Sequence, residues 1–195
     1  MLKQSLLIFT LTFALVSGFS GPIQAQSNDA ETASAEELKS LFKKQKSRGL
    51  ALLSNSTATT VAVPTVTAEG KTEIAQVVYS EIEKDDQVNV RVTFDFDSAV
   101  LRTEEKPKLA SLCEAMKDVD VAQFRIVGHT DGSGSDSYNE KLSLLRAQEV
   151  KRFLVGDCGI DAARLETVGM GKRFLFNKDD PRADENRRVE FQALS

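Results

Sequence analysis

Cysteine and histidine are scarce in this chain of 195 residues, which has two cysteines and one histidine. A structural zinc site needs closely spaced cysteine or histidine ligands, whereas Cys113, His129 and Cys158 are well separated in the sequence. The sequence also contains no segment that resembles a calcium-binding loop. We therefore expect neither a metal ion nor another cofactor.

Dense clusters of basic residues are missing from the second half of the chain, and the formal net charge is -4. A protein that binds nucleic acid must neutralise a phosphate backbone with many Lys and Arg side chains. The charge balance therefore argues against a nucleic-acid partner.

A hydrophobic run long enough to cross a membrane is also missing. The apolar stretch from Leu6 to Phe19 follows Lys3 and precedes the small residue Ala25, which is typical of a secretory signal peptide. An uncleaved membrane anchor is the alternative, but a spanning helix needs about 20 apolar residues. We predict that residues 1–25 are a signal peptide, that the mature chain has no transmembrane span, and that it resides in the periplasm.

The two cysteines, Cys113 and Cys158, have two possible roles in an exported protein. A disulfide between them would stabilise the fold by about 3 to 5 kcal/mol. Alternatively, both are buried free thiols that pack as small apolar side chains. The sequence does not decide between these alternatives, because a disulfide depends on the Cα separation.

Residues 26–84 are predicted to form an N-terminal helix and a flexible linker. Ser34 and Glu37 match a capping box, in which each side chain bonds the backbone amide of the other residue. The helix is predicted from about residue 35 to 48, and Gly49 would end it.

The apolar stripe of this helix consists only of Leu38, Leu41 and Phe42. So narrow a stripe does not hold a core by itself. The helix either docks on a partner or a membrane surface, or it rests loosely on the main domain, which is the interpretation we favour.

The stretch 54–71 is rich in Thr, Ala, Val and Ser, and we interpret it chiefly as linker. A short helix or turn is expected over residues 72–82.

Residues 85–195 show the alternation of strands and helices that predicts an α/β (α+β) fold. Residues 87–96 alternate apolar and polar side chains, as a strand with one buried face does. The other expected elements are a helix over 103–117, a strand over 124–129, a helix over 136–155, and strands over 165–170 and 188–194. This order predicts a βαβαββ-type sandwich, in which helices pack on one face of a mixed sheet.

Arg146 is the anomalous residue of the second of these helices. On a helical wheel it falls in the middle of the apolar face, between Leu142 and Val150, and Asn139 projects the same way. A guanidinium group cannot be left without a partner in such a place. A carboxylate must therefore come from the protein or from a ligand.

Three aspartates lie where they could provide that carboxylate, namely Asp95, Asp97 and Asp131. In one interpretation Arg146 forms an internal ion pair that only fixes the fold. In the other, Arg146 binds a ligand carboxylate while Asp131 binds an ammonium group. Physical arguments alone favour the two about equally.

His129, the only histidine, could suggest acid–base catalysis. No serine or cysteine nucleophile accompanies it in a recognisable motif. We therefore interpret it as a structural, hydrogen-bonded residue at a strand end, and we expect the protein not to be an enzyme.

A set of motifs in a fixed order identifies the second half of the chain more specifically. FDFDSAVL begins at Phe94, and GHTDGSG, YNEKLSLLRAQEV, GID, RLETVGMG and NRRVEF follow it. From Val88 to Leu194 the chain strongly resembles the OmpA-like peptidoglycan-binding domain. The resemblance implies non-covalent binding of the peptide stem of peptidoglycan, with recognition of meso-diaminopimelate. Its principal ligand contacts fall here on Asp131 and Arg146.

The same resemblance implies further ligand contacts at Asn139, Asp97 and Arg187. It implies peptidoglycan as the partner and the cell envelope, including the outer membrane, as the location. The alternative is an envelope adaptor, whose N-terminal helix recruits a partner protein while wall binding only positions it. This chain departs from larger members of the family, because it has no room for an eight-stranded barrel.

Overall fold

The computed structural model describes residues 33–52, 59–66, 72–95 and 98–194. The expected signal peptide and Asp97 lie outside these residues. The helices are α1 Ala35–Leu52, α2 Ala110–Asp118 and α3 Asp136–Gly156, and the strands are β1 Thr59–Val66, β2 Thr72–Tyr79, β3 Val88–Val90, β4 Phe124–His129, β5 Leu165–Gly171 and β6 Val189–Ala193. In the part of the chain that is described, no helix is both long and apolar enough to cross a membrane.

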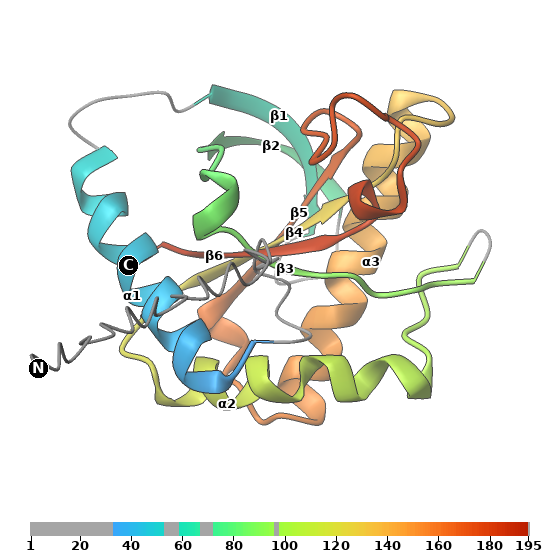
Figure 1. The fold of residues 1–195 in the computed structure, drawn as a ribbon. Helices are drawn as coiled ribbons and strands as arrows, with labels where there is room; N and C mark the ends of the chain where they lie inside the picture. Colours follow the sequence, from blue (N-terminus) through green and yellow to red (C-terminus); the bar gives the residue numbers. More distant parts are fainter. Residues whose placement is uncertain (1–32, 53–58, 67–71, 96–97, 195) are drawn as a thin grey trace, which may run out of the picture.

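The central sheet is mixed and has the order β3-β6-β4-β5. Strands β4 and β5 are parallel, as expected for two strands joined by a crossover helix, and β6 runs antiparallel to both β3 and β4. All three helices lie on one side of this sheet (Figure 1). The predicted βαβαββ sandwich with helices on one face is confirmed.

Strand alternation gives the sheet two different faces. Phe124, Ile126 and Phe191 point to the helices and are fully buried in the main core. Val127 points the other way, into a smaller apolar cluster with Val63 and Tyr79. Successive residues of a strand face opposite sides of the sheet. Strand β4 therefore contributes side chains both to the main core and to the smaller apolar cluster.

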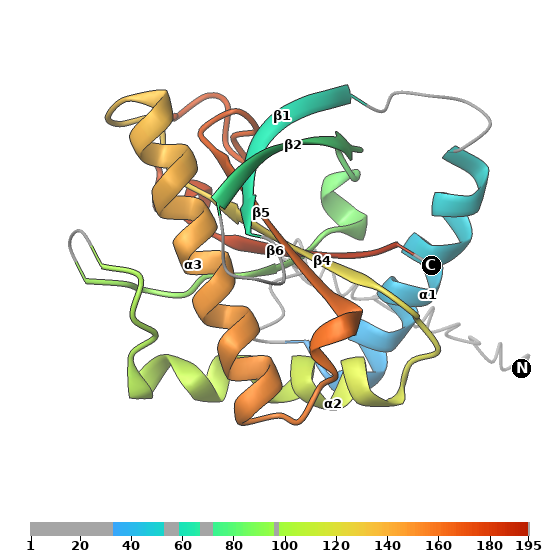
Figure 2. The same cartoon turned by 180° about the vertical axis from the view of Figure 1, so that it is seen from behind.

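The second face is covered by a β-hairpin, which corrects our interpretation of this segment as linker and turn. Strands β1 and β2 pair antiparallel from Thr59↔Tyr79 to Val66↔Thr72, and they lie across the central sheet from the helices (Figure 2). Arg125 donates to the Val78 carbonyl oxygen at 2.8 Å and thereby ties the hairpin to β4. The sequence did not predict these strands, because this Thr- and Ala-rich segment shows no clear alternation of apolar and polar residues.

Helix α1 is an integral part of the main core, so the prediction that it rests loosely is wrong. Leu38 and Phe42 are fully buried, and the Phe42 ring packs edge-on against Phe124 with centroids 5.0 Å apart. Gln45 accepts from the Ala193 amide at 2.8 Å and donates to the Asp86 carbonyl oxygen at 2.8 Å. The narrow stripe is sufficient because α1 fills a gap between α2 and β6 instead of forming a core alone.

The start of α1 follows the predicted capping box. The Glu37 carboxylate accepts from the Ser34 amide at 2.8 Å, and the Ser34 hydroxyl accepts from the Glu37 amide at 3.3 Å. The helix continues past the expected end at Gly49 to Leu52.

Strand β3 is much shorter than the strand that we predicted over residues 87–96. It pairs with β6 only through Val88, Asn89 and Val90, because the partner chain turns away before Val189. Beyond this point the Thr93 amide donates to the Glu105 carboxylate at 3.1 Å. The helix expected over 103–117 begins as a 3-10 helix, η2 Thr103–Leu109, and becomes α-helical at Ala110.

Two glycines allow α3 to lie unusually close to the sheet. A Cβ atom on Gly128 in β4 would come within 2.0 Å of the Ser143 carbonyl oxygen, and one on Gly169 in β5 within 2.4 Å of the Glu140 carbonyl oxygen. Only glycine is compatible with these contacts. The N-terminal half of α3 is therefore pressed against the strand ends that carry the site.

Cys113 of α2 and Cys158, just after α3, are joined by a disulfide with Cα atoms 5.7 Å apart. The bond connects α2 to the segment that follows α3. It lies at the opposite end of α3 from the turn described next.

Candidate functional site

The glycine-rich turn between β4 and α3 positions the first candidate residue, Asp131. Gly134 has a φ of 80°, a conformation that glycine adopts without strain. The turn is held from three sides: Asn139 donates to the Ser133 carbonyl oxygen at 2.6 Å, Lys172 to that of Gly134 at 2.9 Å, and the Gly132 amide to that of Pro181 at 2.7 Å. The Asp131 carboxylate is therefore presented by a well-anchored loop.

Asp131 is itself fixed by two contacts. One carboxylate oxygen accepts from the Ser133 amide at 2.8 Å, and the other pairs with the Arg187 guanidinium at 3.0 Å. Partial burial by itself would raise the pKa of Asp131, but these two donors outweigh it and lower the pKa. Asp131 is therefore a carboxylate at neutral pH.

Arg146 lies at the margin of the buried face of α3, not in its middle as the wheel indicated. The fully buried residues of the helix centre are Ala147, Val150 and Leu154, whereas Arg146 is half-buried. Its guanidinium carbon lies 4.8 Å from the centroid of the Phe94 ring, and its Nε donates to the Ser98 carbonyl oxygen at 3.3 Å.

Within the described residues, no carboxylate lies at ion-pair distance from Arg146. Asp131 pairs with Arg187, and Asp95 pairs with Arg102 at 3.4 Å. Burial lowers the pKa of Arg146, and the charge of Asp131 opposes that shift. Asp131 and Asp95 are the two candidate partners of Arg146 that the structure describes, and each of them pairs with a different arginine.

Arg146 opens onto a groove with a volume of about 330 Å³. The side chains that line it are those of Arg91, Val92, Thr93, Phe94, Lys108, Arg146, Asp184 and Arg187. Asp184 is paired with Arg187, so the groove presents mainly positive charge. A ligand that fits it should carry anionic groups.

The structure brings three of the predicted ligand residues together and uses the side chain of a fourth to hold the turn. Arg146 and Arg187 line the groove, and Asp131 joins them through its ion pair with Arg187. Asn139 is buried, and its side-chain amide holds the turn. Asp97 lies outside the described residues.

Sequence reasoning missed three charged residues of the groove, namely Arg91, Lys108 and Asp184. Arg91 follows β3, Lys108 lies in η2, and Asp184 begins a short 3-10 helix before β6. Nothing in their local sequence distinguishes them from ordinary solvated charges. Only the folding of three distant segments into one groove identifies them.

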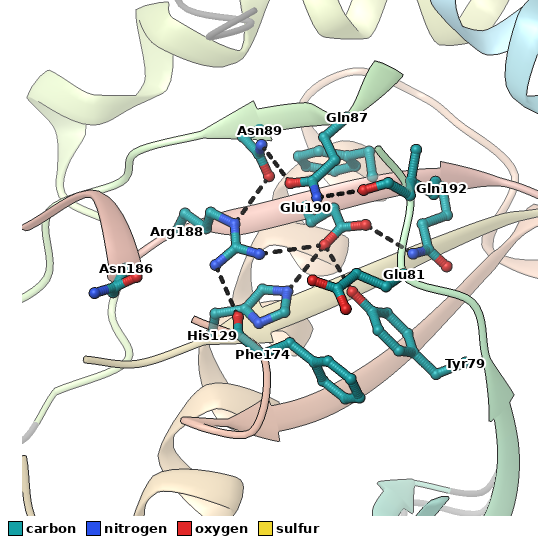
Figure 3. Close-up of polar contacts among 12 residues, drawn as sticks. Tyr79, Glu81, Gln87, Asn89, His129, Phe174, Asn186, Arg188, Glu190 and Gln192 are labelled. Atoms are coloured by element: carbon teal, nitrogen blue, oxygen red, sulfur yellow. Dashed lines mark hydrogen bonds and ion pairs between the residues drawn. The ribbon is translucent and has the colours of Figure 1, made fainter. Parts of the chain in front are cut away.

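A buried polar network includes side chains from β4, β6 and the hairpin strand β2 (Figure 3). Its centre is Glu190 of β6, whose carboxylate lies 3.1 Å from His129 Nε2, accepts from the Tyr79 hydroxyl at 3.1 Å, and accepts from Gln192 at 2.7 Å. Arg188 lies 3.6 Å from the same carboxylate and donates to Asn89 at 3.1 Å. A buried charge needs such partners.

This network holds the end of β4 that leads to Asp131 and the start of β6 that follows Arg187. His129 ends β4 two residues before Asp131, and Arg188 directly follows Arg187 in the sequence. His129 is almost completely buried, in agreement with a structural role at a strand end. The network therefore positions the Asp131–Arg187 pair from the opposite side of the sheet.

His129 should make stability depend on pH. Burial, together with the charge of Arg188, lowers its pKa to about 4 despite the contact with Glu190. In the unfolded chain, His129 takes up a proton near its ordinary pKa of 6.5, whereas in the folded chain it does so only near pH 4. The contribution of neutral His129 to the free energy of unfolding is therefore fully present above about pH 6.5 and is lost as the pH falls towards 4. We expect the free energy of unfolding to fall by about 2 kcal/mol between about pH 7.5 and about pH 5.

Urea unfolding of the wild type and of His129→Gln at these two pH values checks this expectation. Because the chain has one histidine, the variant should lose most of the difference. An equal pH dependence in both proteins would contradict it.

No group of three or more His, Cys, Asp or Glu side chains in the described part of the chain is placed to hold a metal ion.

Comparison with known proteins identifies relatives of the second half of the chain. A family model described as the OmpA family matches residues 93–188. The outer membrane protein Omp38 of Acinetobacter baumannii is 37% identical over 115 residues, which cover 59% of this chain and 30% of that protein. The outer-membrane lipoprotein YfiB of Pseudomonas aeruginosa is 35% identical over 101 residues, covering 51% of this chain and 60% of that one.

Similar solved structures include the OmpA-like domain of FopA1 from Francisella tularensis, with 25% identity, a TM-score of 0.47, and coverage of 70% of this chain and 93% of that one. The peptidoglycan-associated lipoprotein of Burkholderia pseudomallei is 30% identical, with a TM-score of 0.44 and coverage of 52% of this chain and 86% of that one. The chain spans only about a third of the length of Omp38.

Proposed function

Since residues 93–188 of this chain form an OmpA family domain, we propose that the protein binds the peptide stem of peptidoglycan non-covalently and recognises its meso-diaminopimelate through Asp131 and Arg146. The observation that carries this proposal is the half-buried Arg146 guanidinium, which has no carboxylate partner among the described residues and opens onto a basic groove. A ligand carboxylate supplies the missing partner.

Diaminopimelate carries both carboxylate and ammonium groups, and the site offers a partner for each. Arg146 binds a carboxylate with its guanidinium fork, which is held over Phe94. Asp131 binds the ammonium group, because its carboxylate stays ionised and retains lone pairs beyond those used by Ser133 and Arg187. The two contacts together select a zwitterion over a simple anion.

Arg187 and Asn139 support this recognition in different ways. Arg187 fixes the Asp131 carboxylate and lines the groove, so it contributes both to orientation and to attraction of the ligand. Asn139 acts through the turn that it holds. We keep Asp97 as a further ligand residue on the resemblance of its motif.

Sedimentation with purified sacculi tests the proposal. The protein should pellet with sacculi that contain meso-diaminopimelate, and free meso-diaminopimelate should release it. Sacculi in which lysine replaces diaminopimelate provide the control, because lysine lacks the second carboxylate. Failure to pellet with the first kind, or equal pelleting with both, would contradict the proposed recognition.

The alternative adaptor function gains no support from helix α1. Its apolar residues Leu38 and Phe42 are buried against the domain's own core, so they are not available to a partner protein. Deleting this helix would also expose that core. A binding function located in the cell envelope, with export to the periplasm, is the proposal that fits the chain best.

A further inference from the structure

The basic groove extends beyond the residues that a single diaminopimelate group requires. Arg146 and Arg187 account for two of the basic side chains in the lining, and Arg91 and Lys108 come from the wall that the segment after β3 and η2 build. These two side chains have no role in the recognition proposed above.

The wall that carries Lys108 is held by a buried acid. Glu105 is only 5% exposed; its carboxylate accepts from the Thr93 amide at 3.1 Å and pairs with Lys108 at 3.0 Å. Lys108 in turn donates to the Arg91 carbonyl oxygen at 3.4 Å. The segment 91–94 and η2 are therefore fixed to each other, and Lys108 is held at the groove rather than extended into solvent.

The charges of this region favour an anion. Asp184 is the only acidic residue that lines the described groove, and it pairs with Arg187, whereas Arg91, Lys108, Arg146 and Arg187 are all basic. Lys108 and Arg187 also have the protein carboxylates of Glu105 and Asp131 beside them, but the side chains that line the groove are still predominantly basic, and such a lining attracts an anion. The recognition proposed for diaminopimelate uses Arg146 and Asp131 and assigns no group of the ligand to Arg91 or Lys108.

We propose that Arg91 and Lys108 form a second anion subsite, which binds another carboxylate of the same stem peptide, outside the diaminopimelate side chain. This inference rests on the proposed function. Two carboxylates of a stem peptide have the required chemistry: that of the glutamate residue next to diaminopimelate, and that of the peptide's C-terminus. The subsite would extend recognition from one residue to a segment of the peptide.

Calorimetric titration of the full mature chain tests the subsite with free meso-diaminopimelate and with a stem peptide. The peptide is used in three forms, with both carboxylates free, with the glutamate carboxylate amidated, and with the C-terminus amidated. The variant is Arg91→Gln/Lys108→Gln. The control is Lys43→Gln/Lys117→Gln, which removes the same charge from exposed positions outside the groove.

We expect the Arg91→Gln/Lys108→Gln variant to bind the free stem peptide about three- to tenfold more weakly than the wild type, as is typical for partly exposed ion pairs. Its affinity for free meso-diaminopimelate should be unchanged. Amidation of one carboxylate should weaken binding to the wild type by a similar factor and have little effect on the variant, which identifies the carboxylate that the subsite binds.

Equal affinity of wild type and variant for the peptide, or loss of affinity in the control variant to the same extent, overturns the subsite alone. No binding of either ligand to the wild type overturns the proposed function itself. If the double variant has a lowered melting temperature because Glu105 loses Lys108, the exposed Arg91→Gln substitution is used alone, with an expected loss of about threefold.

Discussion

Replacing Arg146 with glutamine is expected to lower the affinity for meso-diaminopimelate by at least about thirtyfold. The substitution removes the half-buried guanidinium group that lies over Phe94. The ligand carboxylate then enters the groove without a cationic partner. Asp131→Asn should cause a loss of similar size, because it removes the partner of the ligand ammonium. Titration calorimetry with the free amino acid, together with sedimentation with sacculi, measures both effects.

Two control variants distinguish this effect from loss of charge and from loss of folding. Arg152→Gln removes the same charge from the same helix at an exposed position, where Arg152 pairs with Glu149 at 2.7 Å, and it should bind normally. Arg146→Lys keeps the charge but loses the fork, so it should recover only part of the affinity. Wild-type affinity in Arg146→Gln with an unchanged melting temperature would exclude the proposed pocket.

Removing the disulfide is expected to cause the largest loss of stability. Cys113 and Cys158 are 45 residues apart in the sequence, and closing a loop of this length stabilises the folded state by about 4 kcal/mol in the chain-entropy model. Urea unfolding of Cys113→Ser/Cys158→Ser, compared with the oxidised wild type, measures the difference. Reduction of the wild type with a thiol should produce a loss of similar size.

Binding should survive this substitution under conditions in which the variant remains folded. The disulfide lies beyond the C-terminal end of α3, whereas the ligand turn precedes its N-terminal end, and a helix of this length separates them by about 30 Å. A change of less than about 1 kcal/mol in the free energy of unfolding would contradict the stability prediction. Loss of binding in the folded variant would contradict the separation of the two ends.

Several elements could be predicted from the sequence because their signals are local. The strand at Phe124–His129 has the predicted bounds, and α3 ends one residue later than predicted. Its N-terminus is set by Ser135, which accepts from the Tyr138 amide at 3.4 Å. The order of these elements was enough to predict a mixed sheet with helices on one face, since parallel strands require a crossover.

The hairpin and α1 show where local signals are insufficient. Neither β1 nor β2 has a regular apolar pattern, and their place is determined by the second face of the sheet, where Glu190 requires the Tyr79 hydroxyl and Val127 requires an apolar cover. The three apolar residues of α1 are few, but they suffice because the rest of the core is supplied by other elements. The positions of the hairpin and of α1 therefore depend on surfaces that several distant segments form together.

For the candidate site, the sequence by itself determined which side chains were anomalous, namely Arg146 on a largely apolar helix face and Asp131 in a glycine-rich turn. Only the tertiary structure decided their partners: it paired Asp131 with Arg187, gave Asn139 to the turn, and added Arg91 and Lys108 to the groove. The physical reason is that a side chain's chemistry is local, whereas the charges and burial that surround it come from segments far apart in the chain.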